Sequence, residues 1–218
     1  MAGLQITMAQ HPEDKHRHSE EPETLTARLR RLTKGPVERL ARAFDRLGFR
    51  PNTLTVIGLL MAGAAALLAA QGRYGAAGLF LLLGAPFDAM DGAVARVSGR
   101  VSRFGALLDS TLDRYGEGLL LAGVGYHMAD SGQLTGVALA FIALLGSVMV
   151  SYVRARAEGL GIEDKVGLLT RVERVVILIL ALLSGQMMIG LWVLAILTQV
   201  TVAQRVWRAY RVACAGGE

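Results

Sequence analysis

The sequence predicts an all-α integral membrane protein with six transmembrane helices, preceded by an amphipathic interfacial helix. Of the 218 residues, 53% are hydrophobic and only 19% are charged, whereas soluble domains are nearer a quarter charged. Mean hydropathy is correspondingly positive, at +0.43. Several stretches reach the roughly 20 apolar residues that a helix needs to cross a bilayer. Lysine and arginine also alternate between successive connecting segments, which supports the same number of spans independently.

Two polar or amphipathic segments precede the apolar part of the chain. Residues 1–23 are rich in charge and lack an apolar core, so we expect a disordered tail rather than a signal peptide. Residues 24–48 place leucines at helical spacing and arginines on other faces, which predicts an interfacial helix on an anionic leaflet, with a kink or break at Gly35-Pro36. Because a membrane span follows directly and aromatic residues do not regularly interleave with the bases, we expect no nucleic-acid partner.

Six apolar stretches follow within residues 49–212, the predicted catalytic domain, and residues 213–218 form a short tail. Residues 53–72 and 134–153 carry no charge. Residues 175–204 form an uncharged run that is too long for one span, and Ser184-Gly185-Gln186 predicts a hairpin within it. Residues 75–97 and 103–128 are equally apolar except for acids and bases at particular positions.

The connecting segments differ in their content of lysine and arginine. The first loop has one arginine, the third and fifth have none, and the second, the fourth and the C-terminal segment are rich in bases. The positive-inside rule therefore predicts a multi-pass protein of the cell's inner or plasma membrane. Both termini and the second and fourth loops would be cytoplasmic.

Four aspartates interrupt the second and third predicted spans near their cytoplasmic ends. Asp88 and Asp91 are three residues apart, and Asp109 and Asp113 are four apart. Each pair therefore lies on one helix face, separated by about 60° and about 40° around the axis. Because the connection between the spans is short, the two faces can meet.

Such a cluster is best explained by hard divalent cations. Carboxylates that converge without a cation repel one another, and an ionised group inside a span is costly. All-oxygen ligands suit Mg²⁺, Mn²⁺ or Ca²⁺, and no nearby His or Cys indicates zinc or copper. The pattern predicts a site for two Mg²⁺ ions, with Mn²⁺ as an alternative, that carries out phosphoryl chemistry.

The residues around the aspartates suit an anionic ligand. Gly92 and Gly105 leave room for a ligand beside the carboxylates, Ala95 is small, and Arg96 can offer its donors to a phosphate. Taken singly, these residues are equally explained by helix packing and by membrane topology. The whole pattern is Asp88-x2-Asp91-Gly92-x2-Ala95-Arg96-x8-Gly105-x3-Asp109-x3-Asp113.

This pattern resembles the signature of the CDP-alcohol phosphotransferases, integral membrane enzymes that make phospholipids, at every position. The resemblance covers about residues 37–212 and agrees with six spans. It implies transfer of a substituted phosphate from a CDP-linked lipid, such as CDP-diacylglycerol, to an alcohol, with release of CMP. By similarity, Asp88, Asp91, Asp109 and Asp113 would bind the metals, with Asp113 also the general base. Gly92, Ala95, Arg96 and Gly105 would bind the CDP donor.

A second basic cluster bears on the acceptor. The segments "SYVRARAEGLG" and "RVER" are similar to the acceptor region of phosphatidylinositol-phosphate synthases and their dialkylether relatives. By this resemblance Ser151, Arg154 and Arg174, with a late arginine such as Arg211, would bind the phosphate of a phosphorylated polyol, inositol phosphate. That branch often has lysine at the position of Arg154. Glycerol 3-phosphate, the acceptor of a phosphatidylglycerophosphate synthase, is therefore the alternative, and the arginines are also explained as positive-inside residues.

Two other classes of protein would also place acids in membrane helices. A cation transporter would need acids near the middle of the bilayer, with broken helices or inverted repeats, and neither is evident in this chain. A membrane scaffold would leave the aspartates unexplained. By family resemblance we expect a homodimer, and the spans rich in glycine and alanine permit close helix contacts within or between chains.

Overall fold

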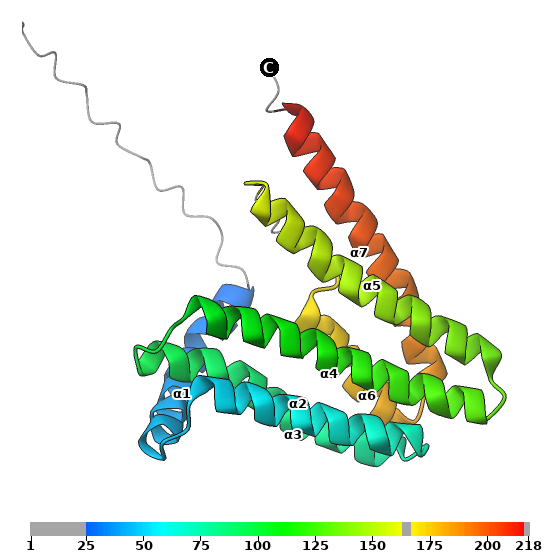
Figure 1. Cartoon of the computed structure of the whole chain (residues 1–218), viewed down its shortest axis with the longest axis horizontal. Helices are drawn as coiled ribbons and strands as arrows, with labels where there is room; N and C mark the ends of the chain where they lie inside the picture. Colours follow the sequence, from blue (N-terminus) through cyan, green and yellow to red (C-terminus); the bar gives the residue numbers. More distant parts are fainter. Residues whose placement is uncertain (1–24, 163–166, 216–218) are drawn as a thin grey trace, which may run out of the picture. The chain divides into compact units, whose positions relative to one another are not determined.

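The structure is a computed structural model that describes residues 25–162 and 167–215, and all regular structure in these ranges is helical (Figure 1). The predicted all-α fold class is therefore confirmed. The predicted tail of residues 1–23 and the last three residues lie outside the described ranges. The helices are α1 (Leu25–Arg46), α2 (Pro51–Ala70), α3 (Tyr74–Val97), α4 (Arg103–Asp130), α5 (Leu134–Gly159), α6 (Arg171–Ser184) and α7 (Met187–Ala215).

Helix α1 contains the predicted break point. The chain divides into two compact units, Met1–Pro36 and Val37–Glu218, and the division lies at the Gly35-Pro36 pair. Both residues nevertheless belong to α1, so the pair does not end the helix. Within the second unit, Ala41 is fully buried in a small cluster with Leu54 and Val94, from α2 and α3.

Within the residues that the structure describes, four helices are long and apolar enough to span a membrane: Pro51–Ala70, Tyr74–Val97, Leu134–Gly159 and Met187–Cys214. By length and composition these helices fit the predicted integral membrane protein. The remaining two predicted spans correspond to α4 and α6. Helix α4 has 28 residues but carries several charged side chains, and α6 has only 14 residues.

The predicted hairpin within residues 175–204 is confirmed. Helix α6 ends at Ser184, and α7 begins at Met187. Gly185 connects them with a left-handed backbone, at φ 70°. This conformation is open to glycine but strained for residues with a side chain, so the sequence can reverse direction here in very few residues.

Helices α2 to α7 form a closed ring. The main packing pairs are α2 with α3, α3 with α6, α6 with α7, α7 with α5, α5 with α4, and α4 with α2 (Figure 1). Since consecutive helices joined by tight turns run in opposite directions, the C-terminal ends of α3, α5 and α7 lie at the same end of the ring as the N-terminal ends of α2, α4 and α6. All the predicted site residues belong to this end.

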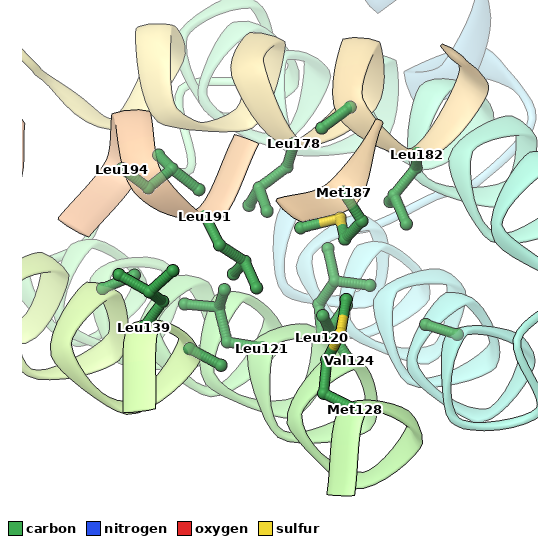
Figure 2. Close-up of a cluster of buried hydrophobic side chains, with 14 of the residues drawn as sticks. Leu120, Leu121, Val124, Met128, Leu139, Leu178, Leu182, Met187, Leu191 and Leu194 are labelled. Carbon is green, nitrogen blue, oxygen red and sulfur yellow. The ribbon is translucent and has the colours of Figure 1, made fainter. Parts of the chain in front are cut away.

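Buried apolar side chains hold the ring together at its centre. Figure 2 shows leucine, valine and methionine side chains of α4, α5, α6 and α7 pointing toward one another. The side chains of four of them are 0% exposed: Leu120, Val124, Leu182 and Leu191. Each such side chain contributes about 1.5–3 kcal/mol in water, but in a bilayer this cluster stabilises the fold mainly by close packing, since lipid is as apolar as leucine.

Close packing of α2 on α4 depends on a glycine. A Cβ atom at Gly123 would lie 2.2 Å from the backbone oxygen of Ala66. We therefore expect Gly123→Ala to push the two helices apart and to lower the free energy of unfolding by about 1–3 kcal/mol. Thermal unfolding in detergent would measure this loss.

The matched control is Gly118→Ala on the same helix. A Cβ atom there would lie 3.5 Å from Leu144 Cδ1, which is an ordinary contact. This variant should be neutral or slightly stabilising, because alanine is the better helix former. Equal stabilities for the two variants would contradict the close approach of α2 and α4.

Candidate active site

The four aspartates come together between the end of α3 and the start of α4. The turn between the helices includes Gly99, with φ 68°, and Ser102, whose hydroxyl accepts a hydrogen bond from the Gly105 N–H at 2.9 Å and caps α4. Asp109 is close enough to Asp88, Asp91 and Asp113 to repel each of them electrostatically. The two helix faces therefore meet as the spacing predicted.

Arg171, the first residue of α6, bridges two of these aspartates. Its Nη2 atom lies 2.7 Å from Asp88 Oδ2 and 2.6 Å from Asp113 Oδ1. The side chain of Asp113 is only 9% exposed, and that of Arg171 is 33% exposed. Sequence reasoning missed Arg171, although it is the first arginine of the quoted segment "RVER". No local spacing relates it to aspartates that precede it by more than fifty residues.

Asp91 is held by groups of its own. It is buried, and it accepts hydrogen bonds from Thr55 Oγ1 on α2, at 2.8 Å, and from the Gly92 N–H. These two donors fix the direction of the carboxylate. Thr55 was also missed from sequence, because a threonine near the start of a span has no distinctive signature.

Gly58, one turn beyond Thr55 on α2, allows Asp88 to approach that helix. A Cβ atom at Gly58 would lie 2.1 Å from Asp88 Oδ1. The carboxylate of Asp88 thus occupies the space that any other residue at this position would fill. The structure adds a third glycine to the site, beside Gly92 and Gly105.

The predicted donor-binding residues line one cavity of about 290 Å³. Its walls include Gly92, Ala95 and Arg96 of α3 and Gly105 of α4, together with Asp91 and Asp109. Thr55 borders this cavity and also a smaller one of about 40 Å³ that contains Asp88, Asp113 and Arg171. Each of the two cavities is therefore bordered by two of the four aspartates, and Thr55 lies beside both.

Arg174 does not share a cavity with the other predicted acceptor residues. Its side chain is 2% exposed, and its Nε and Nη2 donate to Glu117 Oε1 and Oε2 at 2.7 Å and 3.0 Å. Its Nη1 also donates to the Leu169 carbonyl oxygen, at 3.5 Å. This two-point ion pair joins α4 to α6 one turn beyond Arg171. Glu117 was not singled out from sequence.

Ser151 and Arg154 border a third, more open cavity of about 560 Å³ between α4 and α5, together with Arg114. Arg154 Nε lies 2.8 Å from Glu158 in an exposed ion pair. Arg211 is exposed near the end of α7 and borders none of these three cavities. The structure thus brings two of the four predicted acceptor residues together.

A different arginine of α7 lies closer to this region. Arg205 is 4% exposed, and its Nη1 donates to the carbonyl oxygen of Val150, the residue before Ser151, at 2.7 Å. A Cβ atom at Gly167 would lie 3.0 Å from its Nε, so it also packs against the segment that leads to α6. The burial of Arg205 was not predicted, because this residue belongs to the basic C-terminal segment that the positive-inside rule explains.

The donor chemistry of the cluster suits a divalent cation. Its oxygen ligands are hard, and the single positive charge of the Arg171 guanidinium, which pairs with two of the carboxylates, offsets only one of their two negative charges. Across the described part of the chain, no three His, Cys, Asp or Glu side chains are gathered closely enough to hold a metal ion. With Arg171 between Asp88 and Asp113, the carboxylates surround a guanidinium instead.

An acidic cluster that borders a cavity at one end of a ring of membrane helices fits a membrane-embedded enzyme of phosphoryl chemistry. Residues 49–207 match the CDP-alcohol phosphatidyltransferase family. The chain belongs to this family and is a transferase of phospholipid synthesis.

Relatives with a known name agree with this assignment. The archaetidylinositol phosphate synthase of Pyrococcus horikoshii is 39% identical over 186 residues, which cover 85% of this chain and 96% of that protein. Two crystal structures of the Mycobacterium tuberculosis phosphatidylinositol phosphate synthase are 31% identical. The one with CDP-DAG bound has a TM-score of 0.72 and covers 80% of this chain and 93% of that one. The one in complex with manganese and citrate has a TM-score of 0.70 and covers 80% and 88%.

Proposed function

We propose that the protein transfers a phosphatidyl-type group from a CDP-linked lipid, such as CDP-diacylglycerol, to inositol phosphate, and releases CMP. The observation that carries this proposal is the single cavity of about 290 Å³ lined by Gly92, Ala95, Arg96 and Gly105. Asp91 and Asp109 border the same space, so a nucleotide diphosphate there would lie against the carboxylates. The relative with CDP-DAG bound supports a donor of this class.

Asp88, Asp91, Asp109 and Asp113 would hold divalent metal, which we propose to be two Mg²⁺ ions, with Mn²⁺ able to replace them. The manganese complex of the Mycobacterium tuberculosis relative supports a divalent ion. When bound, such ions would neutralise the pyrophosphate and stabilise the charge that develops on the departing CMP. The protein's contribution is to fix the carboxylates, through Thr55 on Asp91 and through the space beside Gly58 for Asp88.

Asp113 would act as the general base. The acceptor oxygen attacks the phosphorus that carries the lipid, the bond from that phosphorus to the CMP oxygen breaks, and the acceptor proton passes to Asp113. Asp113 is suited to this role because it borders the small cavity beside Asp88 and lies next to Arg114, which lines the cavity of Ser151 and Arg154. Burial at 9% exposure limits competition from water for the proton.

The acceptor would bind on the α5 side of the aspartates. Ser151 and Arg154 share their cavity with Arg114, and Arg114 Nη1 lies 3.7 Å from Asp113 Oδ2. A phosphate held there would bring its attached polyol toward the base. We propose that Arg205 supplies the late arginine in place of Arg211, because it is the one that contacts the backbone beside Ser151. Arg174 would act through its ion pair with Glu117 and hold α6 in place.

The proposed membrane arrangement has six spans, α2 to α7, with α1 lying at the interface. The closed ring supports this count, because α4 packs between α2 and α5 and α6 packs between α3 and α7, and these four neighbours are the apolar helices long enough to span. Both termini and the site would be cytoplasmic, where a water-soluble nucleotide is supplied, while the lipid tails remain in the bilayer. The homodimer expected from the family stays a prediction.

Parallel turnover assays test the acceptor. Purified protein in detergent would receive CDP-diacylglycerol and Mg²⁺ with inositol phosphate, glycerol 3-phosphate, serine or inositol, and CMP would be measured. We expect release with inositol phosphate alone. CMP release with glycerol 3-phosphate alone would instead show that the protein is a phosphatidylglycerophosphate synthase. Ion flux into vesicles without CMP release from any mixture would refute the enzyme and support a cation transporter that uses the aspartates.

Gly58→Ala should slow this reaction without unfolding the protein. The new Cβ atom would displace the Asp88 carboxylate, since it would lie 2.1 Å from Oδ1. Misplacing a reacting group by about 1 Å costs about 100-fold in rate, so we expect CMP release to fall by about that factor. Gly63→Ala is the control on the same helix, because nothing lies within 4 Å of its added Cβ atom. Equal rates for both variants would show that the reaction does not require glycine at position 58.

A further inference from the structure

We infer that Arg171 is a built-in counter-ion that occupies the aspartate cluster when metal is absent, and that it competes with divalent metal for Asp88 and Asp113. This inference rests on the proposed metal site. To that site the inference adds a function for Arg171, which would leave the carboxylates when metal binds.

The geometry places one guanidinium nitrogen between two carboxylates. Arg171 Nη2 lies 2.7 Å from Asp88 Oδ2 and 2.6 Å from Asp113 Oδ1. These are charge-assisted hydrogen bonds of the short kind, and they use an oxygen of each aspartate that a metal ion would need. The Coulomb repulsion between a guanidinium and a divalent ion at this distance is large in a half-buried site, so both cannot occupy it together.

Arg171 is also placed so that it can move. It is the first residue of α6, its side chain is 33% exposed, and it borders a small cavity, so part of the flexible side chain is not covered by neighbouring atoms. Arg174, one turn further along the helix, is by contrast 2% exposed and fixed by Glu117. The helix is thus anchored by one arginine while the other is free to change partners. Without any cation, four neighbouring carboxylates would repel one another, and Arg171 relieves that repulsion.

Direct metal binding tests the competition without any turnover. Mn²⁺ alone would be titrated into the full-length protein in detergent at pH 8, with free Mn²⁺ followed by electron paramagnetic resonance. If the metal-competent form is about 10% populated in the wild type, Arg171→Gln should bind Mn²⁺ about tenfold more tightly. Arg171→Lys, which keeps the charge, should remain within about threefold of the wild type.

Arg73→Gln is the matched control for net charge. It removes one exposed arginine just before α3, at the far end of the ring from the aspartates, and it should leave Mn²⁺ affinity unchanged. Unchanged or weaker binding by Arg171→Gln, or an equal gain in Arg73→Gln, would overturn the counter-ion inference alone. Failure of the wild type and of Arg171→Gln to bind any Mn²⁺ would overturn the proposed metal site, and the inference with it.

A second measurement uses the wild type, so that it does not depend on the folding of a variant. Phenylglyoxal modifies arginines that are free of tight ion pairs, and peptide mass spectrometry reports each site. Saturation with Mn²⁺ should increase modification of Arg171 severalfold while Arg174, buried against Glu117, stays protected. Equal modification of Arg171 with and without Mn²⁺ would show that it does not leave the carboxylates.

Discussion

Asp113→Asn is expected to lower the rate of CMP release by about 10²- to 10⁴-fold, the range that a general base contributes. Asparagine has the same shape as aspartate but cannot take up the acceptor proton, and it gives up one negative charge for the metal. We expect the variant to fold, because Arg171 keeps its ion pair with Asp88, at 2.7 Å, when Asp113 is replaced. Purified variant would be assayed with CDP-diacylglycerol, inositol phosphate and Mg²⁺.

The control for this substitution lies on the same helix. Asp130→Asn changes an exposed residue at the last position of α4, at the far end of the ring from the site. Its activity should equal that of the wild type. Thermal unfolding would show whether Asp113→Asn is folded, and a folded variant with activity within about threefold of wild type would exclude Asp113 as the base.

Glu117→Gln is expected to produce the largest loss of stability, about 3–5 kcal/mol, because it leaves the charge of Arg174 buried without its partner. The side chains of the pair are 6% and 2% exposed, and Arg174 Nε donates to Glu117 Oε1 at 2.7 Å. Since the pair joins α4 to α6, its loss should also loosen the start of α6. Thermal unfolding in detergent would measure the change.

Two comparisons isolate the burial of this pair. Glu158→Gln breaks the ion pair with Arg154, whose side chains are 51% and 52% exposed, and such a helix pair contributes only about 0.3–0.5 kcal/mol. The double variant Glu117→Leu/Arg174→Met removes both buried charges and should recover most of the loss, because an apolar pair of similar volume needs no partner. Equal losses for Glu117→Gln and Glu158→Gln would show that the pair at Glu117 is not shielded from water.

The sequence by itself determined those features that depend on short distances along the chain. Helical periodicity sets which side chains share a face, so the spacing of Asp88 with Asp91, and of Asp109 with Asp113, fixed two acidic faces. The turn between α3 and α4 is short, and their meeting followed from it. Similarly, Ser184-Gly185-Gln186 within an uncharged run too long for one span predicted the reversal between α6 and α7. Gly185 provides the left-handed backbone there, which few other residues adopt.

Only the tertiary structure decided the partners of these faces. The order of helices in the ring places α6 against α3, which brings Arg171 to Asp88 across 83 positions of sequence. It also pairs Arg174, a predicted phosphate ligand, with Glu117 across 57 positions. Thr55 and Gly58 acquired their roles in the same way, from the packing of α2 on α3. The physical reason is that apolar helix faces attract one another about equally in a bilayer, so hydrophobicity does not select the neighbours of a helix. Close packing and buried charges select them, and no local sequence pattern encodes these contacts.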